Sequence, residues 1–366
     1  MQLLCLFLSV LLALPAPALR LTAAATGSDT LPAGALSALE AVLDQTALTL
    51  TADAFRLDHA GEALLSARLG EALCCNDAAC ALDGVSIGSA DLAQTAQALG
   101  ELLAPWEAQS EQAVDLQEAG SARTVFTYAL TGEEWAELLP QAAALLGECL
   151  PGAEAIAGAE IVGKGTFKRY FDKDGREIGA YFYAAEVHLN GEAREVRLEY
   201  AMAPGKGFFV AFRCPNAKGT SDFRVSLHGK DRGGAYTLSG EIRRAAGADS
   251  DVVTLDGKTD GKLTINYSRK RGGATAAYAL TLTLREGGAD FTYALNRRAV
   301  LRGTLAWEAA EAPDLSLPAP NADLEGVASA LALRLYACMR AASPGHWQEL
   351  AHALAAQTLI DAQAEE

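Results

Sequence analysis

The sequence is poor in positive charge, and this shortage argues against several kinds of protein. Its 366 residues include 30 Lys and Arg against 46 Asp and Glu, which gives a formal net charge of −16. A basic nucleic-acid-binding protein is not expected, because binding to phosphates needs a positive surface. Hydrophobic residues make up 50% of the chain and charged residues 21%. This balance excludes a disordered polar chain. The length of the chain predicts one large domain or two ordinary ones.

Long apolar runs are also absent, except at the N-terminus. Leu3 to Leu14 is an apolar run too short to span a bilayer comfortably, and Ala16-Pro17-Ala18 follows it as a small-x-small cleavage site. Residues 1–18 therefore predict a secretory signal peptide, which places the protein outside the cell or in the cell envelope. No Lys or Arg precedes the run, so a retained anchor is the alternative. After cleavage we expect no integral membrane span.

Cysteine is scarce, but its number matters in an exported chain. Removal of residues 1–18 leaves an even count of six, which allows three disulfides. The alternative is that several are buried free thiols, because cysteine packs as a small apolar residue. The six disulfide candidates are Cys74, Cys75, Cys80, Cys149, Cys214 and Cys338.

Charge divides the chain into three regions. Residues 1–162 carry 21 acids and 4 bases, and lysine is absent from them. Residues 163–308 carry 17 acids and 24 bases, and residues 309–366 carry 8 acids and 2 bases. With the signal peptide set apart, residues 19–162 are predicted as a mainly helical region and 163–308 as an antiparallel β-sheet region. Residues 309–366 are predicted as a linker followed by helices.

The N-terminal region contains several helix signals. An amphipathic stretch begins near Ser89, and Thr131 with Glu134 forms a capping box that opens a second helix. Pro140 lies inside that helix and is expected to kink or split it. Between these helices, residues 123–130 have strand character, and residues 34–73 mix helical and alternating signals.

The middle region alternates apolar and polar residues between turn sequences. Leu263, Ile265 and Tyr267 share one face of a predicted strand, for example. Turn sequences such as Asn190-Gly191 and Gly272-Gly273 separate the runs. One apolar and one polar face per strand predict an antiparallel sheet. We therefore predict an α+β fold: a long meander of about ten strands, forming a curved sheet or half-barrel, covered by N- and C-terminal helices.

The C-terminal region supplies part of the expected cover. A proline-containing linker precedes a helix from Asp323 to Met339, and Pro344-Gly345 separates it from a second helix. Residues 19–366 are thus predicted to form one α+β unit. A long antiparallel meander backed by helices in an exported protein is similar to the lipoprotein-carrier fold of bacterial envelopes. This resemblance is one of architecture and supplies no residue.

Catalytic and metal-binding motifs are missing or incomplete. The stretch from Gly158 to Gly165 lacks the Ser or Thr that ends a phosphate-binding loop, and a strand follows it instead of a helix. Asp172 and Asp174 lack the other ligands of a calcium loop, so a hairpin turn is favoured. His346 and His352 have the wrong spacing for a helical zinc pair. We expect no cofactor and no metal and assign no catalytic residues, so the sequence favours a non-enzymatic protein and leaves enzymatic activity open.

Two surface features are candidate binding sites. Four tyrosines on apolar strand faces form a tentative face for an apolar ligand: Tyr200, Tyr236, Tyr267 and Tyr278. The alternative is that they are core residues beneath helices. Three cations before a Gly-Gly turn form a tentative cationic rim: Arg269, Lys270 and Arg271. The alternative is an ordinary charged hairpin end that prevents edge aggregation.

These observations favour an exported, non-enzymatic binding or scaffold protein of the bacterial cell envelope, with a lipid or other apolar ligand held between sheet and helices. A module that binds an envelope protein or an anionic glycan through its surface is the second hypothesis. A hydrolase with an unrecognised site is the third. The sequence does not identify the ligand, the disulfide connectivity or the oligomeric state.

Overall fold

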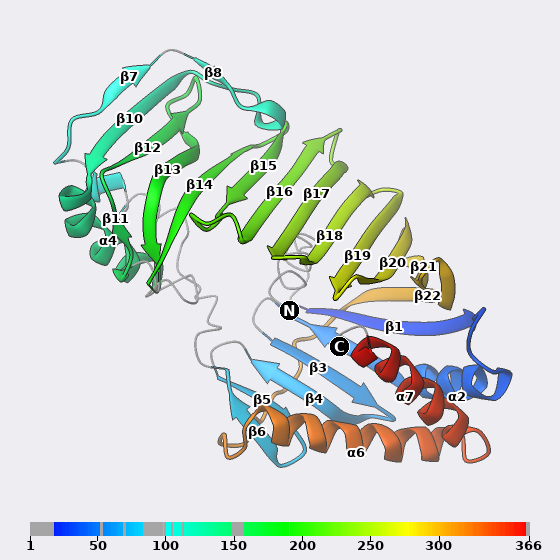
Figure 1. The fold of residues 1–366 in the computed structure, drawn as a ribbon. Coiled ribbons are helices and arrows are strands. Elements are labelled where there is room, and N and C mark those ends of the chain that lie inside the picture. The colour runs from blue at the N-terminus through cyan, green and yellow to red at the C-terminus, as the bar shows by residue number, and fades with distance from the viewer. Residues whose placement is uncertain are drawn as a thin grey trace. The chain divides into compact units, whose positions relative to one another are not determined.

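The structure, a computed structural model, divides the chain into two compact units (Figure 1). Unit 1 comprises Met1–Ile87 and Leu282–Gln363, and unit 2 comprises Gly88–Thr281 and Ala364–Glu366. The predicted signal segment, residues 1–17, lies outside the described residues. The described residues are 18–51, 54–68, 71–82, 98, 100–103, 105–111, 113–147, 157–189 and 191–363.

Unit 1 contains an antiparallel sheet built from both ends of the chain. Strand β1 lies between β22 and β2, so that Leu21 pairs with Trp307 on one side and with Leu48 on the other. Strands β3 to β6 follow β2 in chain order, and β21 pairs with β22. The strands are β1 (Ala18–Gly27), β2 (Thr46–Leu50), β3 (Ala54–His59), β4 (Glu62–Arg68), β5 (Ala72–Cys75), β6 (Ala78–Ala81), β21 (Gly288–Leu295) and β22 (Arg298–Ala310).

Unit 1 contains three helices. They are α2 (Ala33–Asp44), α6 (Leu324–Ala342) and α7 (Trp347–Gln363). Helices α2 and α6 contact the strands of the unit, and α7 packs against the other two helices. Ala35 and Ala38 of α2 are fully buried against Leu350 of α7, which is 1% exposed. The Asp323 carboxylate caps α6 by accepting a hydrogen bond from the Gly326 N–H at 2.8 Å. These contacts confirm the two C-terminal helices that the sequence predicts.

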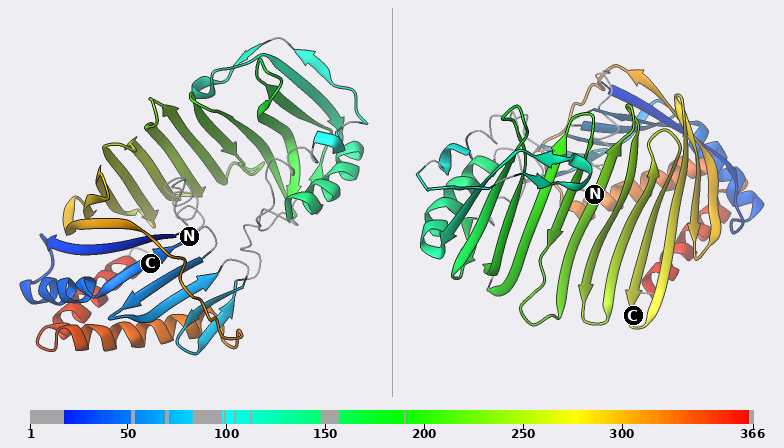
Figure 2. Two further views of the ribbon diagram at one scale, coloured as in Figure 1. Left: turned by 180° about the vertical axis from the view of Figure 1, so that it is seen from behind. Right: turned by 90° about the horizontal axis from the view of Figure 1, so that it is seen from above.

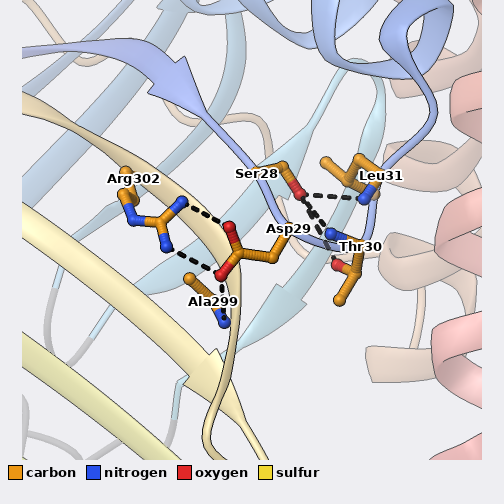
Figure 3. A network of polar contacts seen from close by, with 6 residues as sticks. All are labelled: Ser28, Asp29, Thr30, Leu31, Ala299 and Arg302. Atoms are coloured by element: carbon orange, nitrogen blue, oxygen red, sulfur yellow. Dashed lines mark hydrogen bonds and ion pairs between the residues drawn. The ribbon is translucent and has the colours of Figure 1, made fainter.

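An ion pair fixes the end of β1 to β22 (Figure 3). The Arg302 guanidinium donates to both oxygens of Asp29, at 2.8 and 2.7 Å. The Ala299 N–H donates to the same carboxylate at 3.3 Å. The Ser28 hydroxyl accepts from the Leu31 N–H at 2.8 Å and so turns the chain toward α2. The hydrogen bonds from Arg302 lower the pKa of Asp29 below its usual range, and a smaller burial effect opposes this.

Unit 2 is a long antiparallel meander in which each strand from β12 to β18 pairs with the next (Figure 2). Most of the turns contain glycine at positive φ, including Gly191 and Gly273, as the turn sequences predict. The strands are β7 (Gln109–Glu111), β10 (Thr124–Thr131), β11 (Glu160–Ile161), β12 (Lys164–Phe171), β13 (Glu177–Leu189), β14 (Glu192–Ala203), β15 (Gly207–Arg213), β16 (Ser221–Asp231), β17 (Tyr236–Ala246), β18 (Asp249–Lys258), β19 (Lys262–Arg271) and β20 (Ala274–Arg285), the last of which crosses the boundary at Leu282.

Helix α4 (Gly132–Gly147) covers one face of the unit 2 sheet, which we name the α4 face. The capping box is confirmed, because the Glu134 carboxylate accepts from the Thr131 N–H at 2.7 Å and the Thr131 hydroxyl accepts from the Glu134 N–H at 3.4 Å. The helix is not split at Pro140, which lies inside it and is exposed.

A short segment covers part of the opposite face, which we name the η1 face. It consists of the 3-10 helix η1 (Gln117–Ala119) between the paired strands β8 (Val114–Asp115) and β9 (Ser121–Ala122). Leu116 and Ala119 pack there against Phe209 of β15, which is 1% exposed. The His228 ring joins η1 to the sheet, with Nδ1 3.0 Å from Glu118 Oε2 and Nε2 3.0 Å from the Ser226 hydroxyl.

The structure shows a mostly antiparallel sheet with a few helices but corrects the predicted sheet. The prediction of about ten strands in a curved sheet or half-barrel is wrong, because the sheet formed by the described residues has about 20 strands and is neither closed nor curled. Much of the difference comes from the first third, where strands such as β1 and β2 occur beside the helices α2 and α4. These strands are rich in Ala and Leu, which also favour helices, and strand pairing overrides this local preference.

The structure does not show the disulfides expected from the cysteine count. The described cysteines are free thiols: Cys74, Cys75, Cys80, Cys214 and Cys338. Cys149 lies outside the described residues. Most of the predicted helix after Ser89 also lies outside them. Among the described residues, no helix has the length and apolar character needed to cross a membrane.

Candidate functional site

An apolar pocket of about 480 Å³ lies on the α4 face of unit 2. This volume is within the range of small-molecule sites, which extends from about 300 to 1,000 Å³. All fifteen residues of its lining are apolar. They are Leu102, Leu103, Trp135, Leu138, Leu139, Ala142, Ala159, Ile161, Phe167, Phe182, Val187, Leu189, Val196, Leu198 and Phe212.

Helix α4 forms one wall of the pocket. Trp135, Leu138, Leu139 and Ala142 follow one another at helical spacing and therefore share one side of the helix. The first three of them are at most 9% exposed. Apolar burial of this side is what attaches α4 to the sheet, and the capping box fixes where the helix starts.

Strands β12 to β15 form the opposite wall. Along β13, Phe182 and Ala184 have even numbers, whereas Val187 and Leu189 have odd ones. A β-bulge between Ala184 and Val187 inserts one extra residue into β13, as the register with β14 shows. The bulge brings both pairs to the same face of the sheet, because side chains otherwise alternate between faces. Without it, Val187 and Leu189 would point away from the pocket.

Trp135 is the aromatic anchor of the helix wall. Its ring packs edge-on against Phe182, with the centroids 5.3 Å apart and an interplanar angle of 89°. The indole also lies directly over Gly165 of β12, where a Cβ atom would overlap Nε1. Nε1 is buried and has no hydrogen-bond partner among the described residues. The close approach of indole to strand therefore requires glycine at this position.

The charge of Arg169, which lies near this wall on β12, is neutralised by an ion pair with Glu177. Arg169 follows Phe167 on the same face of β12, and its Nη2 lies 2.6 Å from Glu177 Oε2. The hydrogen bond to Glu177 raises the pKa of Arg169, and burial opposes this. The guanidinium also lies over the Phe171 ring at 5.1 Å. Because every residue of the lining is apolar, the pocket suits the apolar part of a ligand.

The four predicted tyrosines share the α4 face but do not line this pocket. Tyr267 and Tyr278 stack with centroids 5.5 Å apart, and the Tyr267 hydroxyl donates to Asp251 at 2.9 Å. Tyr236 packs against Phe208, and Tyr200 is 42% exposed. Their role in ligand binding stays a prediction.

The predicted cationic rim is divided between the two faces of β19. Arg269 and Arg271 point to the α4 face, and Lys270 points to the η1 face, as the alternation along the strand requires. Arg271 donates to Asp251 at 2.6 Å, which neutralises part of the rim. Burial raises the pKa of Asp251, but its hydrogen bonds with Arg271 and Tyr267 outweigh this and leave it below the usual range. The rim as a binding site stays a prediction.

Four of the described thiols are not activated as nucleophiles. Burial raises the pKa of Cys74, Cys75, Cys214 and Cys338, which favours the neutral thiol at physiological pH. No group of three or more His, Cys, Asp or Glu residues with the geometry of a metal site occurs in the described part of the chain.

The wider comparisons give this pocket no precedent. No protein-family model matches the chain, and no curated protein or solved structure has significant similarity to it. The function must therefore be argued from the geometry of the site.

Sequence reasoning identifies the two walls of the pocket but not the space between them. The apolar side of α4 and the apolar faces of the strands are both visible as periodic patterns. In β13 the apolar residues change from even positions, such as Phe182, to odd positions, such as Val187. This break in the alternation is the one local signal of a bulge. That the walls leave a cavity depends on how far apart they pack.

Proposed function

We propose that this protein is an exported binding protein that holds an apolar ligand in the pocket beneath α4. The observation that carries the proposal is the size of the pocket together with its wholly apolar lining. An isolated apolar surface of this kind favours association with another apolar group. The predicted signal peptide supports a location outside the cell or in the cell envelope, where lipids are available ligands.

Burial of an apolar ligand in the pocket favours binding but gives only weak affinity by itself. Each methylene transferred from water contributes about 0.8 kcal/mol. A ligand that buries about ten methylenes would gain about 8 kcal/mol, from which the loss of translational and rotational freedom subtracts at least about 4 kcal/mol. The net gain is therefore at most about 4 kcal/mol, which corresponds to a Kd of about 1 mM or weaker. Additional contacts outside the pocket would tighten this binding.

The test is the titration of the full chain with a fluorescent fatty acid, such as cis-parinaric acid. Ala142 lines the pocket, and Ala142→Trp would fill part of it. Ala144 lies on the same helix, is exposed and does not line the pocket, so Ala144→Trp is the matched control. We expect saturable binding to the parent protein and to the control, and at least tenfold weaker binding to Ala142→Trp.

Two results would contradict the proposal. One is the absence of saturable binding to the parent protein at concentrations above its expected Kd. The other is equal affinity of the Ala142→Trp and Ala144→Trp variants, which would place the probe elsewhere. Native mass spectrometry of the unreduced protein, purified from a lipid-containing periplasm, would identify the class of any ligand retained.

A further inference from the structure

Four arginines form a straight row across the η1 face of unit 2. Arg197 of β14 pairs with Arg213 of β15, which pairs with Arg224 of β16, which pairs with Arg243 of β17. The residues are direct cross-strand partners, so their side chains emerge from the same face. Neighbouring strands are about 4.8 Å apart, so the row offers one guanidinium at each strand.

The row is exposed and only partly neutralised. The side chains of Arg197 and Arg224 are 54% and 48% exposed, and both remaining arginines are exposed. Arg197 pairs with Glu199 at 3.5 Å, and Arg224 pairs with Asp222. The side chains of Arg213 and Arg243 form no hydrogen bond or ion pair with any described residue.

The carboxylates of this face lie beside the row and not within it. Glu195 and Asp222 are two residues from Arg197 and Arg224 on one side, and the alternation of β14 and β16 places them on the same face. Glu199 and Glu241 lie on the other side of the row. The row is therefore bordered by separate acids, and Arg213 and Arg243 have no ion-pair partner among the described residues.

This row is unfavourable for the fold. Like charges that are direct partners on neighbouring strands destabilise a sheet, by about 0.2–1 kcal/mol for each pair. Two of the four arginines lack an acidic partner that would offset the repulsion. A bound anion would supply the missing partner, because guanidinium binds carboxylate through two parallel hydrogen bonds.

We infer that the arginine row binds the carboxylates of a linear anionic glycan that lies across strands β14 to β17. A uronic-acid glycan carries one carboxylate on each sugar ring and no positive charge, so it can offer carboxylates to the unpaired guanidinium groups of the row. Tyr181 adds an aromatic surface at the start of the row, where the Arg197 guanidinium lies 5.5 Å from its ring centroid.

The inference is tested by titrating the full chain with an oligogalacturonate at low ionic strength. We expect Arg213→Gln and Arg243→Gln each to weaken binding by about two- to fivefold, as for exposed ion pairs. Arg244→Gln is the matched control, because Arg244 is the next residue of β17 and points to the opposite face. Raising the salt concentration should weaken binding to the parent protein.

Thermal unfolding of the same variants separates binding from structure. Arg213→Gln removes like-charge repulsion, so its Tm should equal or exceed that of the parent while its affinity falls. The inference is overturned if oligogalacturonate does not bind, or if Arg244→Gln weakens binding as much as Arg243→Gln. Tighter binding of polyphosphate, a single-stranded oligonucleotide or a polyglutamate peptide would also overturn the assignment to a glycan. Binding of the fluorescent fatty acid should be unaffected by these variants, because the pocket lies on the other face.

Discussion

Replacing Gly165 by alanine would test the contact that joins α4 to the sheet. A Cβ at this position would overlap Trp135 Nε1 and would lie 3.0 Å from Cε2 and 3.1 Å from Cδ1, closer than the 3.4 Å at which ordinary contact begins. A retreat of the indole would disrupt its edge-on contact with Phe182, because Trp135 is buried and packs against that ring. Overpacking of this kind typically costs about 1–3 kcal/mol.

The assay is thermal unfolding followed by circular dichroism and tryptophan fluorescence. For a unit of this size, each kcal/mol corresponds to about 2–4 °C in Tm, so we expect Gly165→Ala to unfold about 2–12 °C below the parent. Its tryptophan emission should also shift, because Trp135 must move. Gly261→Ala is the matched control, because only Lys258 Cβ, at 3.9 Å, comes near the added atom.

An unchanged Tm and emission for Gly165→Ala would refute this account of the contact. The same holds if the two variants are destabilised equally, since the effect would then belong to glycine replacement in general. A fall in Tm with unchanged emission would mean that the sheet yields and Trp135 stays in place, which also contradicts the argument.

Two further predictions concern unit 1. Because the pKa of Asp29 is lowered in the folded state, its pairing with Arg302 stabilises the protein above the unfolded pKa and loses this effect as the pH falls through the folded one. Asp29→Asn should therefore remove part of the acid dependence of unfolding, and a pH series of urea titrations with an unaltered slope below pH 5 would contradict this. Leu350→Ala should destabilise the protein by about 2–5 kcal/mol, whereas Leu333→Ala, at a residue 71% exposed, should change stability by less than about 0.5 kcal/mol. Equal effects in denaturant titrations would show that Leu350 is not a core residue.

Features that depend on a few neighbouring residues could be predicted from the sequence. The capping box of Thr131 and Glu134, the strand over residues 124–131 and the glycine-containing turns all occur as expected. In each case the signal is local: a side chain meets a backbone group a few residues away, or glycine relieves strain at positive φ. Such interactions form in nearly any tertiary context.

The number of strands could not be predicted, because pairing is not local. Residues 18–27 have the composition of a helix or a linker, yet they form β1 between β22 and β2. The partner strand β22 comes from the other end of the chain. An Ala- and Thr-rich segment becomes a strand when such neighbours satisfy its backbone groups, and composition alone does not reveal them.

The sequence by itself determined the local structure of this protein: which residues alternate, where the hairpins turn and which side of α4 is apolar. It also determined where charged residues cluster along the chain. Only the tertiary structure decided that the apolar walls enclose a pocket and that four arginines from four strands stand in one row. Both outcomes depend on register and packing distance. Register is set by pairings between strands, and a single bulge in β13 decides which face Val187 and Leu189 occupy.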